Sequence, residues 1–387
     1  MSAGGGADVL IAARALGPEI RLRGDEIESL RHLPPDLARR LGEARLYDMW
    51  APATVGGLEL PLADGLESLE ALAQADGSTA WCAFIGATSA VALAYLDESA
   101  AREITSRPGT LLAGVYAPRG TAEAVDEGYR VTGRWSWGSG IHNADWVMAG
   151  CQRVVGGEVE RVPNGPPVPW MMIAPKADVD LLDTWHVSGL CGTGSTDFVM
   201  HDVVVPARRA VSLIAQRPIA RPLYVFSPFT FLATGIAAVT MGLARAAIDE
   251  VVALARDKRP EGSGRSLAER STAQADVARA EALLRSGRAF FYGTIASLWE
   301  TAQAMAPVTL AQRRDVRLAT THAVRASAEA VDLMYHLAGG TAVYRRSPLS
   351  RIFRDIHVAT QHVMVSPSTL ELTGRLLLGV PTDTTLL

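Results

Sequence analysis

The stretch "WSWGSGIHNADW", residues 135–146, places three tryptophans, two serines and two glycines in twelve positions. This composition suits neither a helix nor an ordinary strand, because glycine and serine are unfavourable in both. An indole face holds flat rings well, a hydroxyl can bond a polar atom, and glycine allows the backbone to approach closely. The stretch therefore predicts one wall of a site for a flat ligand. The alternative is that Trp135, Trp137 and Trp146 are strand residues that fill a core.

Three regions of different character surround this stretch. Residues 1–110 show Leu and Ala at helical spacing and predict an N-terminal helical domain. Residues 111–215 contain short β-rich runs separated by Gly, Pro and Asp, which predict a compact antiparallel sheet or barrel. Residues 216–387 carry three long amphipathic helices, which are typical of a bundle. This order excludes a doubly wound sheet, in which strands and helices alternate throughout.

The composition predicts a soluble protein with a substantial core. Apolar residues make up 48% of the 387 residues, and the net charge of −4 without a dense Lys/Arg run gives no support to nucleic-acid binding. The N-terminus lacks the pattern of a signal peptide, and no run of about 18 apolar residues suggests a membrane span. The three cysteines, Cys82, Cys151 and Cys191, are widely spaced and odd in number, which favours a reducing, cytoplasmic setting.

Several standard sites are absent from the sequence. It contains no G-x-G-x-x-G after a strand and no G-x-x-x-x-G-K-[ST], so binding of dinucleotides or phosphates of those types is unsupported. "WGSGI" departs from the nucleophile elbow G-x-S-x-G at Trp137 and lies among predicted strands. His357 and His362 are five residues apart, roughly 140° around a helix, so they do not share a face as metal ligands would. No metal site is expected.

Two further stretches are "GLCGTGSTD" at residues 189–197 and "RIFRDIHVATQHV" at residues 351–363. In this order and layout, the three stretches resemble the acyl-CoA dehydrogenase superfamily. They are closest to its flavin-dependent monooxygenase branch, the oxygenase component of two-component, group D hydroxylases. The resemblance runs from about Leu46 to Arg375. It implies an acyl-CoA dehydrogenase-like fold, mainly α with a central β-barrel, in which a helical domain precedes the barrel and a four-helix bundle follows it. It also implies a homotetramer with flavin between barrel and bundle.

The resemblance assigns flavin contacts to both glycine-rich stretches. Trp137 falls where the superfamily has an aromatic residue beside the isoalloxazine, and Ser139 falls where a hydroxyl bonds the flavin N5 region. Gly138 and Gly140 would let the backbone approach, and Ser195 is a further cofactor candidate. A glycine-rich hairpin that requires positive φ is the alternative for the second stretch. The candidates for the phosphate end, which could equally be solvated surface residues, are Arg265, Gly339 and Gly340.

The third stretch indicates oxygen chemistry. Acyl-CoA dehydrogenases commonly place a catalytic glutamate about eight or nine residues beyond the Arg-Asp pair, and here that spacing reaches Gln361, His362 and Val363. As in the monooxygenase branch, His362 would donate to a peroxyflavin oxygen or accept a substrate proton. Ser139 is the second catalytic candidate. A structural histidine, and a dehydrogenase whose base lies on another helix, are the alternatives. A structural ion-pair cluster is expected of Arg351, Arg354 and Asp355.

The sequence says less about the residues that bind the substrate than about those that bind the flavin. "YVFSPFTF", residues 224–231, holds three Phe and one Tyr, so Phe226 and Phe229 are candidates to bind an aromatic or polycyclic substrate, or else core residues. "DGSTAW", residues 76–81, matches the monooxygenase branch. The helix that follows has Thr88 and Ser89 where that branch often carries a histidine, so Ser89 is a substrate candidate.

The resemblance implies a monooxygenase that hydroxylates this substrate through a C4a-(hydro)peroxyflavin. It would use O2 and reduced FAD or FMN supplied by a separate flavin reductase. The alternatives are N-oxygenation of an amine or amino sugar, an acyl-CoA dehydrogenase, and a non-catalytic flavin-binding relative. The sequence leaves the substrate and the choice of flavin open.

Overall fold

The first part of the chain is helical in the computed structural model, which describes residues 4–162, 165–262, 264–385 and 387. Its helices are α1 (Gly4–Leu22), α2 (Gly24–Leu30), α3 (Pro35–Glu43), α4 (Leu62–Ala73), α5 (Gly77–Ala90) and α6 (Glu98–Ile104). Asp76 caps the start of helix α5: its backbone is extended, and its carboxylate accepts the N–H of Thr79 at 2.7 Å. Because α5 has no charged residue, it can be buried on nearly all sides.

The strands form one open, mixed sheet between Leu112 and Val211. They are β1 (Leu112–Val125), β2 (Gly128–Gly138), β3 (Trp146–Val155), β4 (Glu158–Val159), β5 (Pro169–Pro175), β6 (Asp180–Leu182), β7 (Thr196–Val205) and β8 (Ala210–Val211). Their order is β6-β7-β2-β1-β3-β5-β8, with β4 paired to β3. β1 and β3 are parallel, whereas β2 pairs antiparallel with both β1 and β7.

This strand order shows that the expectation of a closed β-barrel is wrong. Within the described residues, no ladder joins β6 to β8, so the sheet keeps two edges. The edge strands β6 and β8 are only three and two residues long. Strands this short offer few backbone groups for a closing ladder, and short edges are also how open sheets avoid pairing with other chains.

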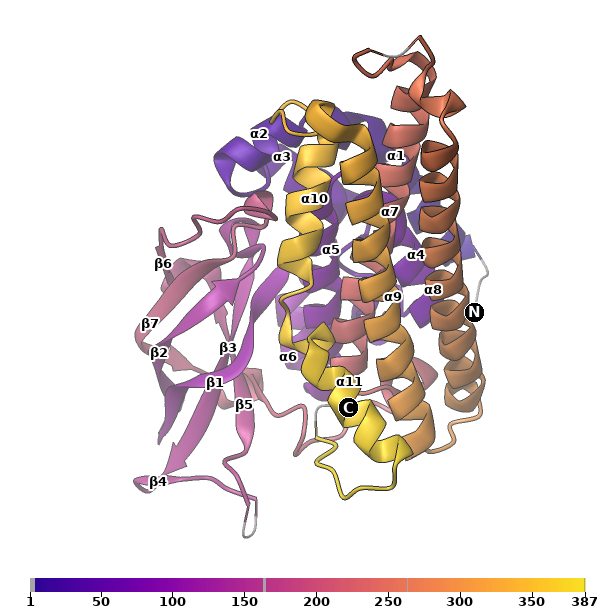
Figure 1. Cartoon of the computed structure of the whole chain (residues 1–387). Helices are drawn as coiled ribbons and strands as arrows, with labels where there is room; N and C mark the ends of the chain where they lie inside the picture. The colour runs from indigo at the N-terminus through magenta and orange to yellow at the C-terminus, as the bar shows by residue number, and fades with distance from the viewer. Residues whose placement is uncertain (1–3, 163–164, 263, 386) are drawn as a thin grey trace.

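Long helices return after the sheet and form the expected four-helix bundle (Figure 1). They are α7 (Pro228–Asp257), α8 (Ser271–Gln303), α9 (Leu310–Ala338) and the shorter α10 (Pro348–Ala359), with α11 (Pro367–Leu377) packed on α9. Helix α7 starts with Pro228 in its first turn, where no N–H is needed, and Ser227 caps it. Among the described residues, two stretches are apolar enough to cross a membrane, Gly77–Tyr95 and Pro228–Asp257, and 83% and 89% of their apolar windows are buried inside the molecule.

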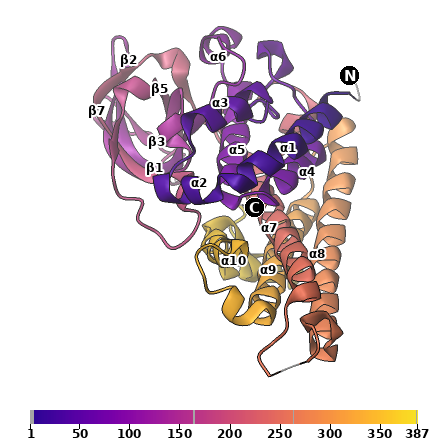
Figure 2. The same cartoon turned by 90° about the horizontal axis from the view of Figure 1, so that it is seen from above.

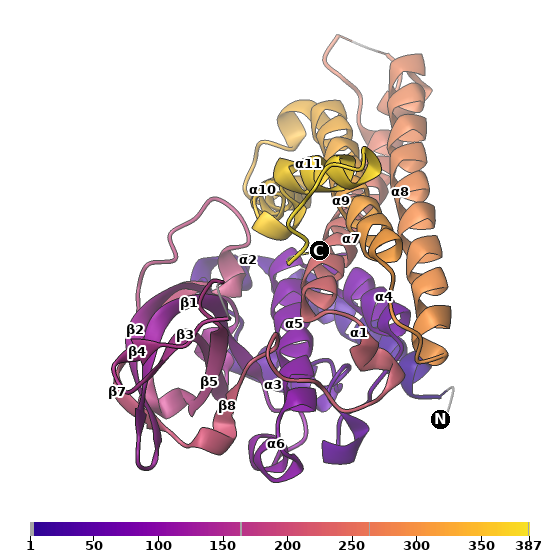
Figure 3. The ribbon, with the colours of Figure 1, turned by 90° about the horizontal axis from the view of Figure 1, so that it is seen from below.

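Helix α5 lies between the sheet and the bundle, as Figure 3 shows. It contacts β1 on one side and α7 on the other, and the short turn Cys191–Thr193 also packs against it. Seen from above, the sheet stands to one side of the helices (Figure 2). Residues on α5 can therefore reach both the sheet loops and the C-terminal helices.

Candidate functional site

The three tryptophans of the opening stretch have different environments. Trp135 is fully buried in the core of the sheet, where its ring stacks on Phe198 with centroids 5.1 Å apart. Trp146 packs partly buried against an apolar cluster under the sheet. Trp137, by contrast, is 68% exposed and has a φ of 71°, which is unusual for a residue other than glycine. The core-filling alternative thus describes Trp135 and Trp146, whereas the indole of Trp137 is free to contact a ligand.

A chain of buried hydroxyls begins beside Trp137. Ser139 Oγ lies 2.7 Å from Ser195 Oγ, which lies 2.6 Å from Thr193 Oγ1. All three residues are buried. From α5, the indole N–H of Trp81 donates to Ser139 Oγ at 3.2 Å. The structure therefore brings the two glycine-rich stretches together, and it places Ser139 and Ser195 in one hydrogen-bonded group.

The two glycine-rich stretches fit together through left-handed turns. Gly140 has a φ of 74°, and its N–H donates to the Thr193 carbonyl at 2.8 Å. Gly194 has a φ of 54°, and a Cβ there would lie only 2.7 Å from Cδ2 of His142. Glycine is required at both positions because other residues rarely adopt this backbone conformation. The positive φ that the hairpin alternative requires is therefore present at Gly194 of the second stretch, and ligand binding by the same residues stays a prediction.

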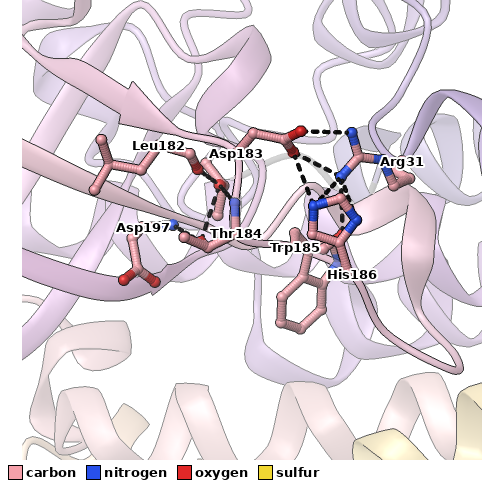
Figure 4. A network of polar contacts seen from close by, with 8 residues as sticks. Arg31, Leu182, Asp183, Thr184, Trp185, His186 and Asp197 are labelled. Carbon is pink, nitrogen blue, oxygen red and sulfur yellow. Dashed lines mark hydrogen bonds and ion pairs between the residues drawn. The ribbon is translucent and has the colours of Figure 1, made fainter.

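The loop before the second stretch is fixed by a polar network (Figure 4). Arg31, at the end of α2, forms an ion pair with Asp183 at 2.6 Å and contacts His186. Thr184 accepts a hydrogen bond from the N–H of Asp197 at 2.9 Å, and its own N–H donates to Thr196 Oγ1 at 3.2 Å. These contacts tie the loop to β7 and to the N-terminal helices, which positions Thr193 and Ser195.

His362 packs near the indole of Trp81, the residue whose N–H bonds Ser139. Its ring centroid is 6.1 Å from that of Trp81. Its Nδ1 accepts the N–H of Met364 at 3.2 Å, and the Met364 carbonyl accepts from the buried guanidinium of Arg317 at 2.8 Å. Burial, assisted by the positive charge of Arg317, lowers the pKa of His362 to about 4. At neutral pH the ring is therefore uncharged, and its hydrogen is on Nε2.

The predicted ion-pair cluster of α10 is held mainly by partners on α2. Arg354 pairs with Glu28 at 2.7 Å, and Arg351 pairs with Asp25 at 3.0 Å. The carboxylate of Asp355 instead accepts a backbone hydrogen bond from the second glycine-rich stretch. The cluster thus connects α10 to both α2 and the loop that carries Thr193.

The other cofactor candidates lie elsewhere in the chain. Gly339 and Gly340 follow the C-terminus of α9, and a Cβ at either position would meet open space. The ammonium of Lys258 contacts this turn through the Ala338 carbonyl and through Thr341 Oγ1. Arg265 lies in the loop that leads from α7 to α8 (Figure 1). This group gathers at one end of the bundle rather than beside Ser139.

The three candidate substrate-binding residues lie in different surroundings. Phe226 packs in the helical core against Phe231 and Trp299, with ring centroids about 6 Å apart. Phe229 contacts the ring of Tyr116 on β1 edge-on at 5.1 Å. Ser89 is buried near the end of α5. Phe229 is thus the candidate that faces the sheet.

Sequence reasoning missed several residues of this site. Trp81 and Thr193 stand inside motifs that were recognised, but nothing in the sequence indicates that they bond to Ser139 or Ser195. Arg317 could have been noticed as an arginine spaced three, four and seven residues from Thr320, Thr321 and Val324 on one helical face. Among the described residues, two buried hydroxyls close to these elements, Thr88 Oγ1 and Tyr116 Oη, have no hydrogen-bond partner.

The groups around Ser139 fit a flavin. The exposed indole of Trp137 offers a flat apolar face, and the buried hydroxyl of Ser139 offers a polar atom next to it. The neutral ring of His362, near Trp81, adds an N–H donor. An aromatic face with a few polar groups is the usual lining of a site for a flat cofactor.

Known proteins resemble this chain over nearly all its length. The model for "acyl-CoA dehydrogenase, C-terminal domain" matches residues 234–367. The indole-3-acetate monooxygenase of Pseudomonas putida is 33% identical over 363 residues, which cover 94% of this chain and 92% of that protein. This degree of similarity extends through the helices, the sheet and the bundle.

Solved structures resemble the fold equally well. The 3-HSA hydroxylase from Rhodococcus sp. RHA1 has a TM-score of 0.91 and 26% identity, covering 98% of this chain and 99% of that one. XiaF from Streptomyces sp., solved in complex with FADH2 and glycerol, also has a TM-score of 0.91 and 26% identity, with 99% and 98% coverage.

Proposed function

This chain belongs to the flavin-dependent monooxygenase branch of the acyl-CoA dehydrogenase superfamily, and we propose that its site around Ser139 and His362 hydroxylates an aromatic small molecule. The chain is an oxygenase component that uses reduced flavin and O2 and depends on a separate flavin reductase. The observation that carries the assignment of the site is the convergence of the exposed Trp137, the buried hydroxyl of Ser139 and the neutral imidazole of His362.

Bound reduced flavin supplies the chemistry of O2 activation. The residues of this chain would bind and orient it: Trp137 would offer its indole face to the ring, and Ser139 Oγ would bind the polar N5 region. Trp81 holds Ser139 in place by its N–H bond, and the same indole packs near His362. Ser139 and Trp81 are buried, so they exclude water from the reacting centre, which strengthens each polar contact.

His362 acts as a hydrogen-bond donor rather than as a base. Its Nδ1 is occupied by the N–H of Met364, so the only hydrogen of the neutral ring is on Nε2. The lowered pKa, about 4, makes proton uptake at neutral pH unfavourable. Of the two functions considered for this residue, donation to an oxygen atom is the one that its geometry supports.

The substrate binds where β1 and the start of α7 meet. The contact of Phe229 with Tyr116 offers aromatic surface for a ring, which the names of relatives such as indole-3-acetate monooxygenase also favour. The unpartnered hydroxyls of Tyr116 and Thr88 are available to bind a polar group of the substrate. Ser89 lies next to Thr88 on the same helix and is a further substrate contact.

The functional enzyme is a cytoplasmic homotetramer in this proposal. Its three cysteines, free in the structure, fit a reducing compartment. Within one chain, the group formed by Gly339, Gly340 and Arg265 lies away from Ser139. It therefore binds the phosphate end of the flavin whose ring lies in a neighbouring subunit. The guanidinium of Arg265 is a suitable group for phosphate, and Gly339 and Gly340, which have no side chain, let a phosphate approach the backbone.

Oxygen transfer tests this function. The protein is mixed with a flavin reductase, NADH, FAD or FMN, isotopically labelled O2 and a panel of phenols and indoles, and the products are analysed by mass spectrometry. A hydroxylated product that carries the label is expected. His362→Ala should lower its yield, whereas His201→Ala, which changes an exposed residue of β7, serves as the matched control.

An acyl-CoA dehydrogenase gives a different result. It would bleach oxidised flavin anaerobically on addition of an acyl-CoA thioester, with no need of O2. Such bleaching, or the absence of labelled product with every aromatic compound, would contradict the proposed function.

A further inference from the structure

The hydroxyl chain that ends at Ser139 has a fixed direction. Thr193 Oγ1 lies 2.8 Å from the carbonyl oxygen of Leu190. A carbonyl oxygen only accepts, so the single hydrogen of the Thr193 hydroxyl points to Leu190. Thr193 can then only accept from its other neighbour, Ser195, 2.6 Å away.

The same reasoning fixes the direction of the hydrogen bonds of Ser195 and Ser139. Because Ser195 donates to Thr193, its oxygen accepts the hydrogen of Ser139 across the 2.7 Å contact. Ser139 also accepts the indole N–H of Trp81. A hydroxyl has one hydrogen and two lone pairs, so Ser139 keeps one lone pair and no hydrogen for a ligand. Towards the flavin it is an acceptor only.

We propose that Thr193 and Ser195 are positioning residues that make this site select reduced over oxidised flavin. N5 of a reduced flavin carries a hydrogen, whereas N5 of an oxidised flavin carries a lone pair. An acceptor at Ser139 bonds the first and faces the second lone pair to lone pair, which is costly in a buried site. This inference rests on the proposed function, since it places N5 at Ser139.

The far end of the chain is well anchored. The N–H of Leu190 is held by the buried carboxyl group of Asp355 at 2.6 Å, which fixes the orientation of the Leu190 peptide. The Leu190 carbonyl also accepts the indole N–H of Trp185 at 3.2 Å. Leu190 itself has a φ of 50°, so this turn depends on these contacts to hold its conformation. The direction of the hydroxyl chain is thus set by a rigid carbonyl outside the flavin contact.

Binding of the two redox states tests this selection. Dissociation constants of oxidised and anaerobically reduced FAD and FMN are measured for the full-length protein and its variants. Thr193→Val removes the terminal acceptor, and Ser195→Ala removes the acceptor of Ser139, so in both variants the Ser139 hydrogen can turn to the flavin. We expect the preference for reduced flavin to fall by about tenfold in each, mainly because the oxidised form binds more tightly.

Two further variants separate direction from general damage. Thr193→Ser keeps a hydroxyl and should keep the preference. Thr240→Val removes a buried hydroxyl that donates to a carbonyl at 3.0 Å within α7, and it should also leave the preference unchanged. The midpoint potential of the bound flavin gives a second readout, because weaker selection of the reduced form lowers that potential.

The outcomes distinguish this inference from the function itself. If reduced flavin binds but Thr193→Val and Ser195→Ala keep the wild-type preference, the hydroxyl chain does not control redox selection and the inference is wrong. If neither redox state of either flavin binds to the wild-type protein, the proposed function fails first. A preference lost equally in Thr193→Ser would assign the effect to packing rather than to the hydroxyl, and would also overturn the inference.

Discussion

Asp355 on α10 accepts the backbone N–H of Leu190, 165 residues earlier in the chain, at 2.6 Å. Gly189, the residue before Leu190, lies so close to α10 that a Cβ there would be 2.3 Å from the Arg354 carbonyl. The loop that carries Thr193 is therefore seated on the helix that leads to His362. The contact between Asp355 and Leu190 links the two parts of the site, which come from the middle and from the C-terminal part of the sequence.

Replacing Asp355 should separate its function as an acceptor from its charge. Asp355→Asn keeps an oxygen for the N–H of Leu190, whereas Asp355→Leu leaves that N–H buried without a partner. We expect Asp355→Leu to lower the free energy of unfolding by about 1–3 kcal/mol and to weaken flavin binding, and Asp355→Asn to change both much less. Thermal unfolding and flavin titration measure the two effects.

The ionisation of Asp355 predicts a pH dependence of stability. Burial, with repulsion from Asp76, raises the pKa of Asp355 to about 7. The folded chain therefore binds this proton more tightly than the unfolded chain, and the contribution to stability falls as the pH rises from about 4 through 7. Asp355→Asn should lack this contribution. Parallel melting curves for both proteins across this range would contradict the assignment.

Substitution of Trp137 should weaken flavin binding, whereas substitution of Trp135, two positions earlier, should lower stability. Trp137→Gly removes an exposed ring and relieves a positive φ, so stability should change by less than about 1 kcal/mol while flavin binding weakens. Trp135→Ala removes a fully buried ring and should cost about 3–5 kcal/mol. Chemical denaturation and flavin titration measure both. Unchanged flavin affinity in Trp137→Gly would mean that the indole does not cover the cofactor.

Arg317 should control the protonation of His362. Arg317→Met removes the positive charge that lowers the pKa of His362, so that pKa should rise, and the loss of activity on acidification should begin at higher pH. Arg317→Lys keeps the charge and should keep the wild-type profile if the ammonium reaches the Met364 carbonyl. Activity profiles and imidazole titration by NMR are the measurements. An identical profile in Arg317→Met would show that burial alone determines the pKa of His362.

The sequence predicts the helices and the strands well, because both depend on local signals. Apolar spacing identifies α7 to α9, and Gly, Pro and Asp mark the ends of the strands. Closure of the sheet into a barrel cannot be predicted from such local signals. It depends on whether β6 and β8, three and two residues long, can pair with each other, and no local pattern records that.

The candidate site is predictable only as far as its motifs extend. Ser139, Ser195 and His362 stand in recognisable stretches, and the structure brings the first two into one hydrogen-bonded group. The direction of the hydrogen bonds in that group depends on the distances to the Leu190 carbonyl and to Trp81, and no motif records those distances. Tertiary contacts of this kind have no signature in a single sequence.

The unpartnered hydroxyls of Thr88 and Tyr116 lead to a prediction about the substrate. A buried hydroxyl without a partner is unfavourable, so Thr88→Val and Tyr116→Phe should each raise the free energy of unfolding by about 1 kcal/mol. If the substrate binds these groups, the same variants should raise its KM about tenfold with little change in kcat, because a ground-state contact is lost. Thr373→Val, which removes a buried hydroxyl on α11 bonded to a carbonyl at 3.0 Å, should lose stability without changing KM. A gain in stability with an unchanged KM in both variants would place the polar group of the substrate elsewhere, and would leave Phe229 as the contact that defines this side of the site.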